Sequence, residues 1–342
     1  MNVVAKDMFS RFKDEKGHFK ACLQHQTKGM LSLYEASYLE KEGELVLSEA
    51  MDFTTKHLKK LVEQGSLEPP LGEQVAYALE LPLHWRMHRL HTRWFIEAYQ
   101  RDATMNPLLL ELAKLDFNMV QGIYKRELSE ASRWWTDIGL AKRLPFFRDR
   151  LVENYLWTVG WAFEPQFSSY REIQTKANCF ITMIDDVYDV YGTLDELELF
   201  TDAVDRWDIN AIDEFPEYMK MCFLAVFNTT NEAAFRITKE KSLDILPYLK
   251  RAWGDLCKAY LVEAKWYQRG HVPKLTREHV GDLIRANWRA LNGNHPRNCF
   301  TTVASNTPRM SHFMYGNGDG YGIPGGETKN QVMALLMEPI MF

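Results

Sequence analysis

The sequence is short of several features that mark familiar classes of protein. Its 342 residues hold only five cysteines, which are far apart and include no Cys-x-x-Cys pair, so neither a disulfide framework nor a cysteine zinc site is expected. The apolar stretches, such as residues 156–163, are far shorter than a membrane span. With 41 basic and 46 acidic residues, the net charge of −5 offers no positive field for nucleic acid or anionic lipid. We therefore expect reduced thiols in core positions, no membrane span and no nucleic-acid partner.

The first residues also lack the signals of export. No apolar segment follows Met1, and Asp7, Asp14 and Glu15 are out of place in a transit peptide, which is poor in acidic residues. We expect a protein of a reducing compartment, cytoplasmic if the chain is complete as given.

Strand-like alternation is missing as well, and helical spacing of apolar residues takes its place. One long example comprises Leu108, Leu109, Leu112, Leu115, Phe117, Val120 and Ile123. Turn signals separate such segments at residues 68–72, 106–107, 164–165, 215–216 and 271–273. The sequence therefore predicts an all-α fold.

Two further features bear on organisation. Residues 102–107 can end one helix and start the next, which suggests a partial N-terminal helical domain over 1–104 and a second domain over 105–342. Six of the 19 glycines lie within Gly316–Gly326, so this segment cannot be the interior of a helix and is predicted to be a mobile loop.

The strongest chemical signal is an acidic cluster, Asp185-Asp186-Val-Tyr-Asp189. On a helix, Asp185 and Asp189 share a face, while Asp186 is rotated away by about 100°. The two carboxylates continue an apolar row formed by Ile173, Ala177 and Ile181. Buried carboxylates need cations, and two oxygen ligands on one helix face suit Mg²⁺, which commonly bridges carboxylates to substrate phosphates. The alternative is a solvated acidic turn.

Basic and aromatic residues precede this cluster. Arg148 and Arg150 flank one residue and could clamp a diphosphate, although two surface arginines would look the same. Residues 154–163 are rich in aromatic side chains, including Trp157, and are explained either by a packed core or by a dry pocket that stabilises a cation. Together with a metal-binding helix, these residues suggest heterolysis of an allylic diphosphate.

With these motifs the chain resembles the plant terpene synthases, most closely the angiosperm monoterpene-synthase branch. The resemblance covers nearly the whole chain and is carried, in order, by residues 132–140, 148–150, 185–197, 206–210, 263–267, 315–322 and 335–339.

The resemblance implies a class I terpene synthase: a helical-bundle catalytic domain behind the remnant of an N-terminal α-barrel domain. It implies a carbon–oxygen lyase that uses Mg²⁺, with Mn²⁺ as an alternative, to ionise a prenyl diphosphate. Geranyl diphosphate is the favoured substrate, and formation of sesquiterpenes from farnesyl diphosphate is an alternative. The family also implies a plastid location, and leaves the oligomeric state open.

The resemblance further implies roles for individual residues. Asp185 and Asp189 would be metal ligands, and Asp186 would belong to the same motif with less direct engagement. Arg148 and Arg150 would steer the released diphosphate, and Trp157 would be a pocket aromatic. The glycine-rich segment around Asp319 would form part of a lid.

The sequence departs from the family pattern in one important respect. The second metal motif, an Asn/Asp–Ser/Thr–Glu set at i, i+4 and i+8, is missing, and the nearest spacing, Asp255, Ala259 and Glu263, lacks the hydroxyl. The chain passes at residues 275–277 from the stretch before this motif to the stretch after it, so a block near residue 276 is absent. Met1 also falls inside the family's N-terminal domain. We therefore expect weak or absent cyclisation, and the alternative to an active enzyme is a catalytically impaired fragment.

One alternative metal site comes from histidines. His84, His88 and His91 stand at i, i+4 and i+7, a spacing that could bind zinc on a helix. Two nearby arginines oppose a metal cation, so a polar helix face is the favoured interpretation.

Overall fold

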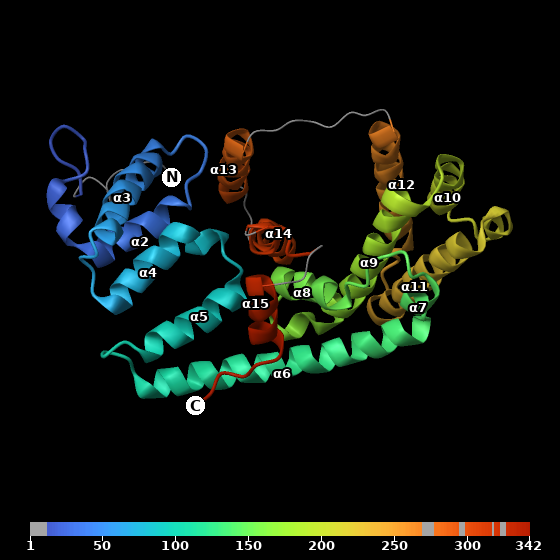
Figure 1. Ribbon diagram of the computed structural model, residues 1–342, viewed down its shortest axis with the longest axis horizontal. Helices are drawn as coiled ribbons and strands as arrows, with labels where there is room; N and C mark the ends of the chain where they lie inside the picture. The colour runs from blue at the N-terminus through green and yellow to red at the C-terminus, as the bar shows by residue number, and fades with distance from the viewer. Residues whose placement is uncertain (1–11, 269–276, 294–297, 317, 322–325) are drawn as a thin grey trace. The chain divides into compact units, whose positions relative to one another are not determined.

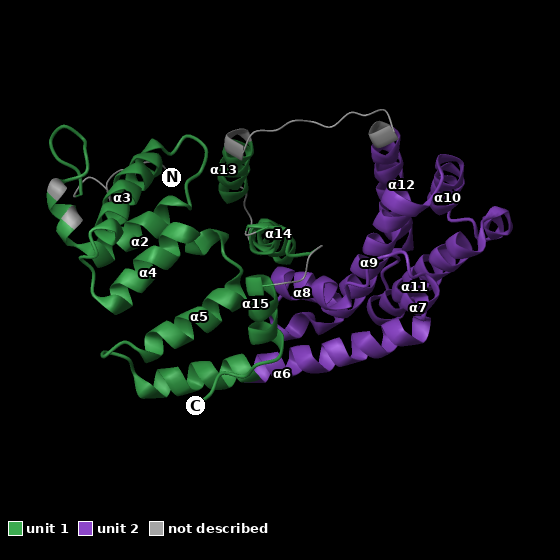
Figure 2. Ribbon diagram, viewed as in Figure 1, with its two compact units in different colours: residues 1–118, 275–342 green, residues 119–274 purple. Residues whose placement is uncertain are grey.

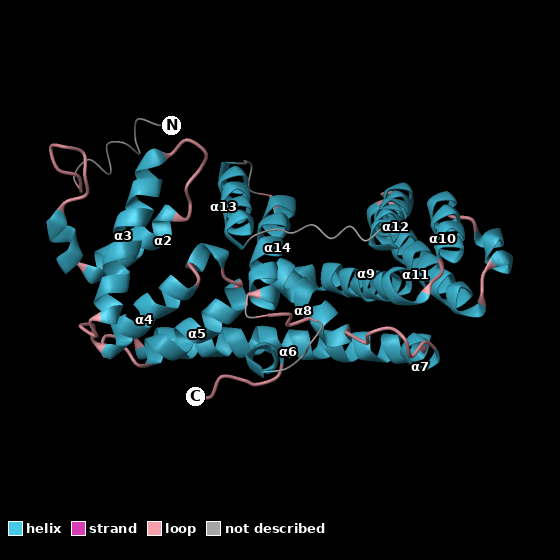
Figure 3. Ribbon diagram, turned by 45° about the horizontal axis from the view of Figure 1, so that its top comes forward, coloured by secondary structure: helices cyan, strands magenta, loops and turns pink. Residues whose placement is uncertain are grey.

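The computed structural model describes all residues except 1–11, 269–276, 294–297, 317 and 322–325. The described residues form helices and connecting loops without a named strand, and one isolated β-bridge joins Lys13 to Phe19. Figure 3, which is coloured by secondary structure, shows helices joined by loops. The predicted all-α fold is confirmed. The described part of the chain contains no helix that is both long and apolar enough to cross a membrane.

The chain divides into two compact units, coloured separately in Figure 2. Unit 1 comprises residues 1–118 and 275–342, and unit 2 comprises residues 119–274. The long helix α6 (Pro107–Ile138) contributes to both units (Figure 1).

Unit 1 is built from helices of both ends of the chain. They are η1 (Ala21–His25), α2 (Thr27–Ser37), α3 (Leu45–Glu63), α4 (Pro69–Glu80), η2 (Leu83–Trp85), α5 (His88–Gln100), α13 (Arg277–Gly293), α14 (Cys299–Tyr315) and α15 (Gly326–Leu336). Helices α2, α3 and α4 pack around Met30, Tyr34, Leu58 and Val75, which are almost fully buried. Apolar residues at helical spacing thus give each of these helices one buried face.

Unit 2 contains the larger apolar core. Its further helices are α7 (Leu140–Arg143), α8 (Leu151–Trp161), η3 (Pro165–Phe167), α9 (Ser168–Asp186), η4 (Val187–Tyr191), α10 (Leu194–Arg206), η5 (Ile209–Glu214), α11 (Glu217–Lys241) and α12 (Leu246–Gln268). Helix α8 packs against α9, and α12 packs against both α10 and η4. The core includes Phe180, Met183, Ile184, Phe200 and Phe223, each at most 1% exposed.

Local sequence explains where these helices begin and end. Thr193 caps α10: its side chain accepts from the amide of Glu196, whose carboxylate accepts from the amide of Thr193. Pro69 occupies the first turn of α4, where no amide donor is needed. Gly139, with φ of 70°, separates α6 from α7 in a left-handed conformation that suits glycine.

The predicted break before Pro107 and the one at residues 215–216 are confirmed, whereas most of the turn predicted at residues 68–72 is helical, since α4 begins at Pro69. Helix α5 ends at Gln100 and α6 begins at Pro107, and Pro216 directly precedes α11. The turn predicted at residues 271–273 lies outside the described residues. In the glycine-rich segment, residues 316 and 318–321 form no helix and lie after α14, while residues 317 and 322–325 are not described.

Burial differs from two expectations. Within α6, Phe117 and Val120 are buried, but Leu108, Leu109, Leu112 and Leu115 are between 51% and 76% exposed. All five cysteines are free, yet only Cys179, Cys222 and Cys257 lie in core positions, because Cys22 and Cys299 are exposed. Helical spacing alone therefore identified these helices without identifying which face is covered.

Candidate functional site

The acidic motif lies where α9 changes its winding. Helix α9 ends at Asp186 and continues as a π-helical turn, η4, that contains Asp189. Four residues are close to one turn of either helix, so Asp185 and Asp189 stay on similar faces. Asp186 is buried, Asp185 is partly exposed and Asp189 is exposed. π-helical turns recur at functional sites.

Arg148 joins the loop before α8 to the end of α9. Its backbone amide donates to Asp186 Oδ2 at 2.6 Å, and its Nε donates to Asp186 Oδ1 at 2.7 Å. Its Nη2 donates to Asp185 Oδ2 at 2.8 Å. The side-chain hydrogen bonds of Arg148, chiefly the one that it donates to Asp186, raise its pKa, so the guanidinium keeps its charge. Asp186, the most buried of the three aspartates, thus holds Arg148 in place.

The other end of the motif is dominated by negative charge. Burial, the carboxylate of Asp185 and that of Glu263 raise the pKa of Asp189, and Arg148 offsets this only in part. Glu263 and Tyr260 belong to α12, which packs against η4. The Tyr260 hydroxyl donates to Asp185, and burial together with this negative environment raises the pKa of Tyr260. The surroundings of Asp189 therefore favour a cation.

Two of these residues have no assigned role in the sequence-based prediction of the site. Glu263 is visible in the sequence only as the end of an incomplete motif, and Tyr260 carries no signal of its own. Both join the cluster because α12 lies against η4. A contact between helices that are distant in sequence cannot be read from periodicity.

Arg150 and Trp157 lie on the helix that follows Arg148. Arg150 is the N-cap residue of α8, and its Nη1 donates to the carbonyl oxygen of Asp149 at 3.4 Å. The Asp149 carboxylate in turn accepts from the Trp135 indole at 3.0 Å. Trp157 is half-buried in the same helix, with its ring centroid 5.5 Å from that of Trp161. Arg150 thus lies at the start of α8, whereas Trp157 lies in the second half of that helix.

The carboxylates of the acidic motif suit a hard divalent cation, but they provide too few ligands to surround it. In the described parts of the chain, no three or more His, Cys, Asp or Glu side chains are grouped so as to hold a metal ion. Asp185 and Asp189 offer carboxylate oxygens in a negative environment, which fits Mg²⁺ with several of its water ligands retained. Asp186 is already bonded to Arg148. The residues therefore provide one carboxylate-bearing helix face for a metal.

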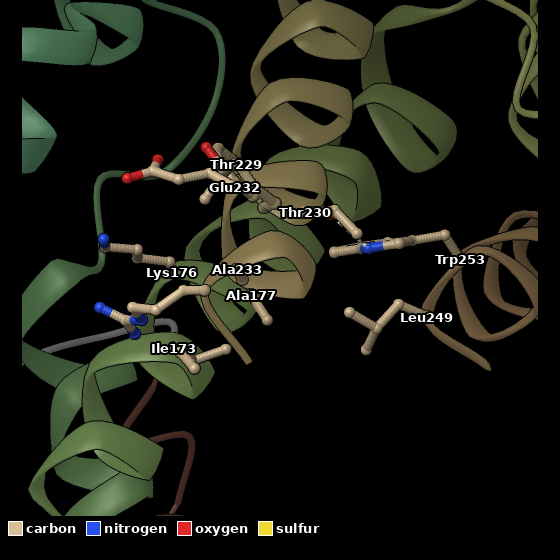
Figure 4. A pocket seen from close by; sticks show the side chains of 11 residues that line it. Ile173, Lys176, Ala177, Thr229, Thr230, Glu232, Ala233, Leu249 and Trp253 are labelled. Atoms are coloured by element: carbon tan, nitrogen blue, oxygen red, sulfur yellow. Dashed lines mark hydrogen bonds between the residues drawn. The ribbon is translucent and has the colours of Figure 1, made fainter. Parts of the chain in front are cut away.

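A small cavity lies deeper along the same helix. It is enclosed by α9, α11 and α12 and has a volume of about 60 Å³. Figure 4 shows Leu249 and Trp253 of α12 on one side and Ile173 and Ala177 of α9 on the other. The Trp253 indole donates to Thr230 Oγ1 at 3.0 Å. Ligand pockets typically measure about 300–1,000 Å³, so this cavity is too small for a ten-carbon chain.

The three histidines considered for zinc do not share one helix. His84 lies in η2, and α5 begins only at His88. His84 Nε2 is 2.8 Å from Asn292 Oδ1, and burial lowers the pKa values of His88 and His91 to about 4. The expectation that one helix carries all three histidines is wrong, and all three side chains are half-buried.

Two segments of the sequence match models of known protein families. Residues 3–79 match the model of the terpene synthase N-terminal domain, and residues 136–282 match that of the terpene synthase metal-binding domain. The chain is 50% identical to monoterpene synthase 7 of Hedychium coronarium, covering 98% of this chain and 72% of that protein. It is 57% identical to alpha-thujene synthase of Litsea cubeba, covering 99% and 73%. The names of both relatives include the word chloroplastic.

Solved structures show the same similarity. Isoprene synthase from grey poplar (Populus x canescens) superimposes with a TM-score of 0.91 at 40% identity, covering 98% of this chain and 80% of that one. Limonene synthase crystallised with 2-fluorolinalyl diphosphate superimposes with a TM-score of 0.93 at 35% identity, covering 98% and 79%. An isoprene synthase structure also holds three Mg²⁺ ions and dimethylallyl-S-thiolodiphosphate.

The alignments also reveal a difference in length. The match to monoterpene synthase 7 extends over 429 residues, whereas this chain has 342. At least 87 of those positions (429 less 342) therefore have no residue here. The shared motifs, the helical fold and the identity over nearly its whole length establish that this chain belongs to the terpene synthase family.

Proposed function

We propose that the Arg148–Asp185–Asp189 region is the diphosphate-ionising site of a Mg²⁺-dependent lyase that converts a prenyl diphosphate into a terpene. The observation that carries this proposal is the unbalanced negative charge around Asp189, next to a guanidinium anchored by Asp186. Geranyl diphosphate is the favoured substrate, because monoterpene synthases are prominent among the relatives. Farnesyl diphosphate is the second candidate substrate.

Each residue of the site has a distinct task in this proposal. Asp185 and Asp189 hold the metal, which when bound neutralises the leaving diphosphate. Asp186 fixes Arg148, and Arg148 and Arg150 bind the diphosphate oxygens as they separate from the hydrocarbon. Trp157 lines the apolar side, where the face of an aromatic ring stabilises a carbocation.

We further propose that this 342-residue chain turns over its substrate weakly or not at all. The alignment leaves at least 87 positions without a residue. We infer that most of the loss falls near residue 276, where the second metal motif of the family would stand. One acidic helix then provides the metal ligands that the family divides between two. The fold would be retained while the reaction is impaired.

Release of diphosphate tests the reaction. Purified chain is incubated with geranyl or farnesyl diphosphate, with Mg²⁺ or with EDTA, and the diphosphate set free is measured beside intact alpha-thujene synthase of Litsea cubeba. We expect Mg²⁺-dependent release far below that of the intact relative. Comparable turnover would contradict the proposed impairment, and the sequence encoding Lys274 to Glu278 in the genome would show whether the missing block is encoded there.

Ligand binding tests the site independently of turnover. Mg²⁺ and inorganic diphosphate together should raise the melting temperature, because a ligand that binds only the folded state stabilises it by mass action. The Asp185→Ala variant should lose this rise, whereas Asp202→Ala, which changes an exposed carboxylate of α10, should keep it. An equal rise in both variants would count against the proposed site.

A further inference from the structure

Unit 1 contains an apolar groove between α13 and α14. Its volume is about 930 Å³, which is large enough for several side chains of another polypeptide. The groove is lined mainly by apolar residues, among them Val280, Ile284, Trp288, Leu291, Pro308 and Tyr315. Apolar residues gathered in an open groove are typical of a surface that another chain covers.

The exposure of α13 has the pattern of a helix with an uncovered face. Val280 and Leu283 are 38% and 45% exposed, and Ile284 is half-buried. Tyr315, at the end of α14, is 52% exposed. A helix normally covers such a stripe against a neighbouring element.

The floor of the groove contains a hydrogen-bond donor without an acceptor. Trp288 is 4% exposed, and its indole nitrogen finds no partner among the described residues. A buried N–H that lacks an acceptor costs about 1–3 kcal/mol. An occupant of the groove that presents an oxygen at this point would remove that cost.

The groove lies next to the place where the sequence departs from the family pattern. Helix α13 begins at Arg277, directly after the discontinuity at residues 275–277. The boundary between the two units falls at the same place, between residues 274 and 275. At least 87 aligned positions have no residue in this chain. Helices average about 10–14 residues, so a block made up of most of these positions would be long enough for several helices.

We propose that the α13–α14 groove is the seat of the missing block, and that it will bind that block when it is supplied as a separate polypeptide. The occupant is an amphipathic helical segment of a terpene synthase. Its apolar face covers Val280, Ile284 and Leu291, and an oxygen of the segment accepts from Trp288. The inference rests on the internal loss included in the proposed function, but binding does not require that the assembled site be active.

The probe is a labelled polypeptide with the residues of monoterpene synthase 7 of Hedychium coronarium that lie opposite the gap. Its binding to the full 342-residue chain is measured by fluorescence anisotropy and by calorimetry. We expect saturable binding with one polypeptide per chain. A scrambled polypeptide of the same composition should not bind.

Variants locate the binding. Ile284→Glu places a charge in the groove and should weaken binding at least tenfold, and Ser311→Arg should do the same by filling the opposite wall. Leu108→Glu is the matched control, because Leu108 is an exposed apolar residue of α6 outside the groove. Circular dichroism verifies that each variant is folded, and the two groove variants allow the test to proceed if one fails to fold.

The outcomes separate this inference from the proposed function. Absence of saturable binding, or equal binding by the wild type and both groove variants, would overturn the inference. A chain that is dimeric by light scattering and becomes monomeric on Ile284→Glu would overturn it as well, since a second copy would occupy the groove. Binding that does not induce release of diphosphate would support the groove while counting against the proposed activity.

Discussion

Unit 2 contains two clusters of arginine and carboxylate side chains, one buried and one partly exposed. Arg171 is fully buried and donates through Nε and Nη2 to both oxygens of Glu127 at 2.8 Å. Its Nη1 donates to the carbonyl oxygens of Ala162 and Glu164, and Glu127 also accepts from Tyr155 and Ser168. Each charge of this cluster is matched inside the protein.

The Arg148 cluster is open by comparison. Arg148 is 39% exposed, and the Asp189 that follows its two aspartates is exposed to the negative charge of Glu263. Burial acts to raise the pKa of Glu127, but the hydrogen bonds from Arg171, Ser168 and Tyr155 outweigh it and lower that pKa, whereas the pKa of Asp189 is raised. Charge that is balanced internally supports the fold, and charge left unbalanced at the surface is available for a ligand.

The largest expected effect comes from breaking the closed cluster. Arg171→Ala would leave Glu127 enclosed without its cation and should lower the free energy of unfolding by about 3–5 kcal/mol. Arg206→Ala is the control, since Arg206 pairs with Asp202 at 2.7 Å on an exposed helix face and should contribute less than about 1 kcal/mol. Urea unfolding followed by circular dichroism compares the two. Equal losses would refute the structural role of Arg171.

Breaking the Arg148 cluster should lower the free energy of unfolding by less than breaking the Arg171 cluster. Arg148→Ala removes the side-chain donors of buried Asp186 but keeps the backbone amide that also bonds it, so we expect a loss of about 1–3 kcal/mol. Adding Asp186→Asn should recover part of this loss, because it removes the unpaired charge. The same urea experiment measures both variants, and a loss larger than that of Arg171→Ala would reverse the comparison.

Acid should act on the closed cluster through Glu127. Its pKa in the folded state lies below the ordinary value of 4.5, so the stabilisation is present above pH 4.5 and is lost as the pH falls through the folded-state pKa. One such group changes stability by up to about 1.4 kcal/mol per pH unit. Unfolding measured between pH 5 and pH 3 should depend less steeply on pH in Glu127→Gln. An unchanged slope would show that Glu127 does not contribute to the loss of stability in acid.

The smallest change in stability should come from replacing Asp189, and it should be a gain. Because the pKa of Asp189 is raised, its charged form is disfavoured in the folded state above pH 3.8, and Asp189→Asn should stabilise the metal-free protein at neutral pH. The site is exposed, so the gain should stay below about 1 kcal/mol. Melting curves without Mg²⁺ measure it. Destabilisation by this variant would mean that the negative charge around Asp189 is already balanced.

Much of the candidate site follows from residue spacing. The run Asp185–Asp189 on a helix, after an apolar row, predicts two carboxylates on one face, and the structure places them on α9 and η4. The spacing also identified Asp186 as different, but it did not show why. Asp186 is buried because Arg148, 38 residues earlier, folds back to bind it.

Other features depended on which helices meet. The leucines of α6 have a helical period that predicts the helix correctly, yet four of them are exposed because no described element covers that side. Tyr260 and Glu263 joined the acidic end of η4 because α12 packs there. Periodicity is a property of one segment, while burial is a property of the pair that packs.

The sequence by itself determined the helical class and the family, and it predicted a metal-binding role for the acidic motif, since each depends on residue types and short spacings. Only the tertiary structure decided that Arg148 is held by Asp186, that Glu127 and Arg171 form a closed pair, and that α13 and α14 leave an apolar groove uncovered. These outcomes depend on contacts between distant segments, where the exclusion of water decides whether a charge or an apolar face requires a partner.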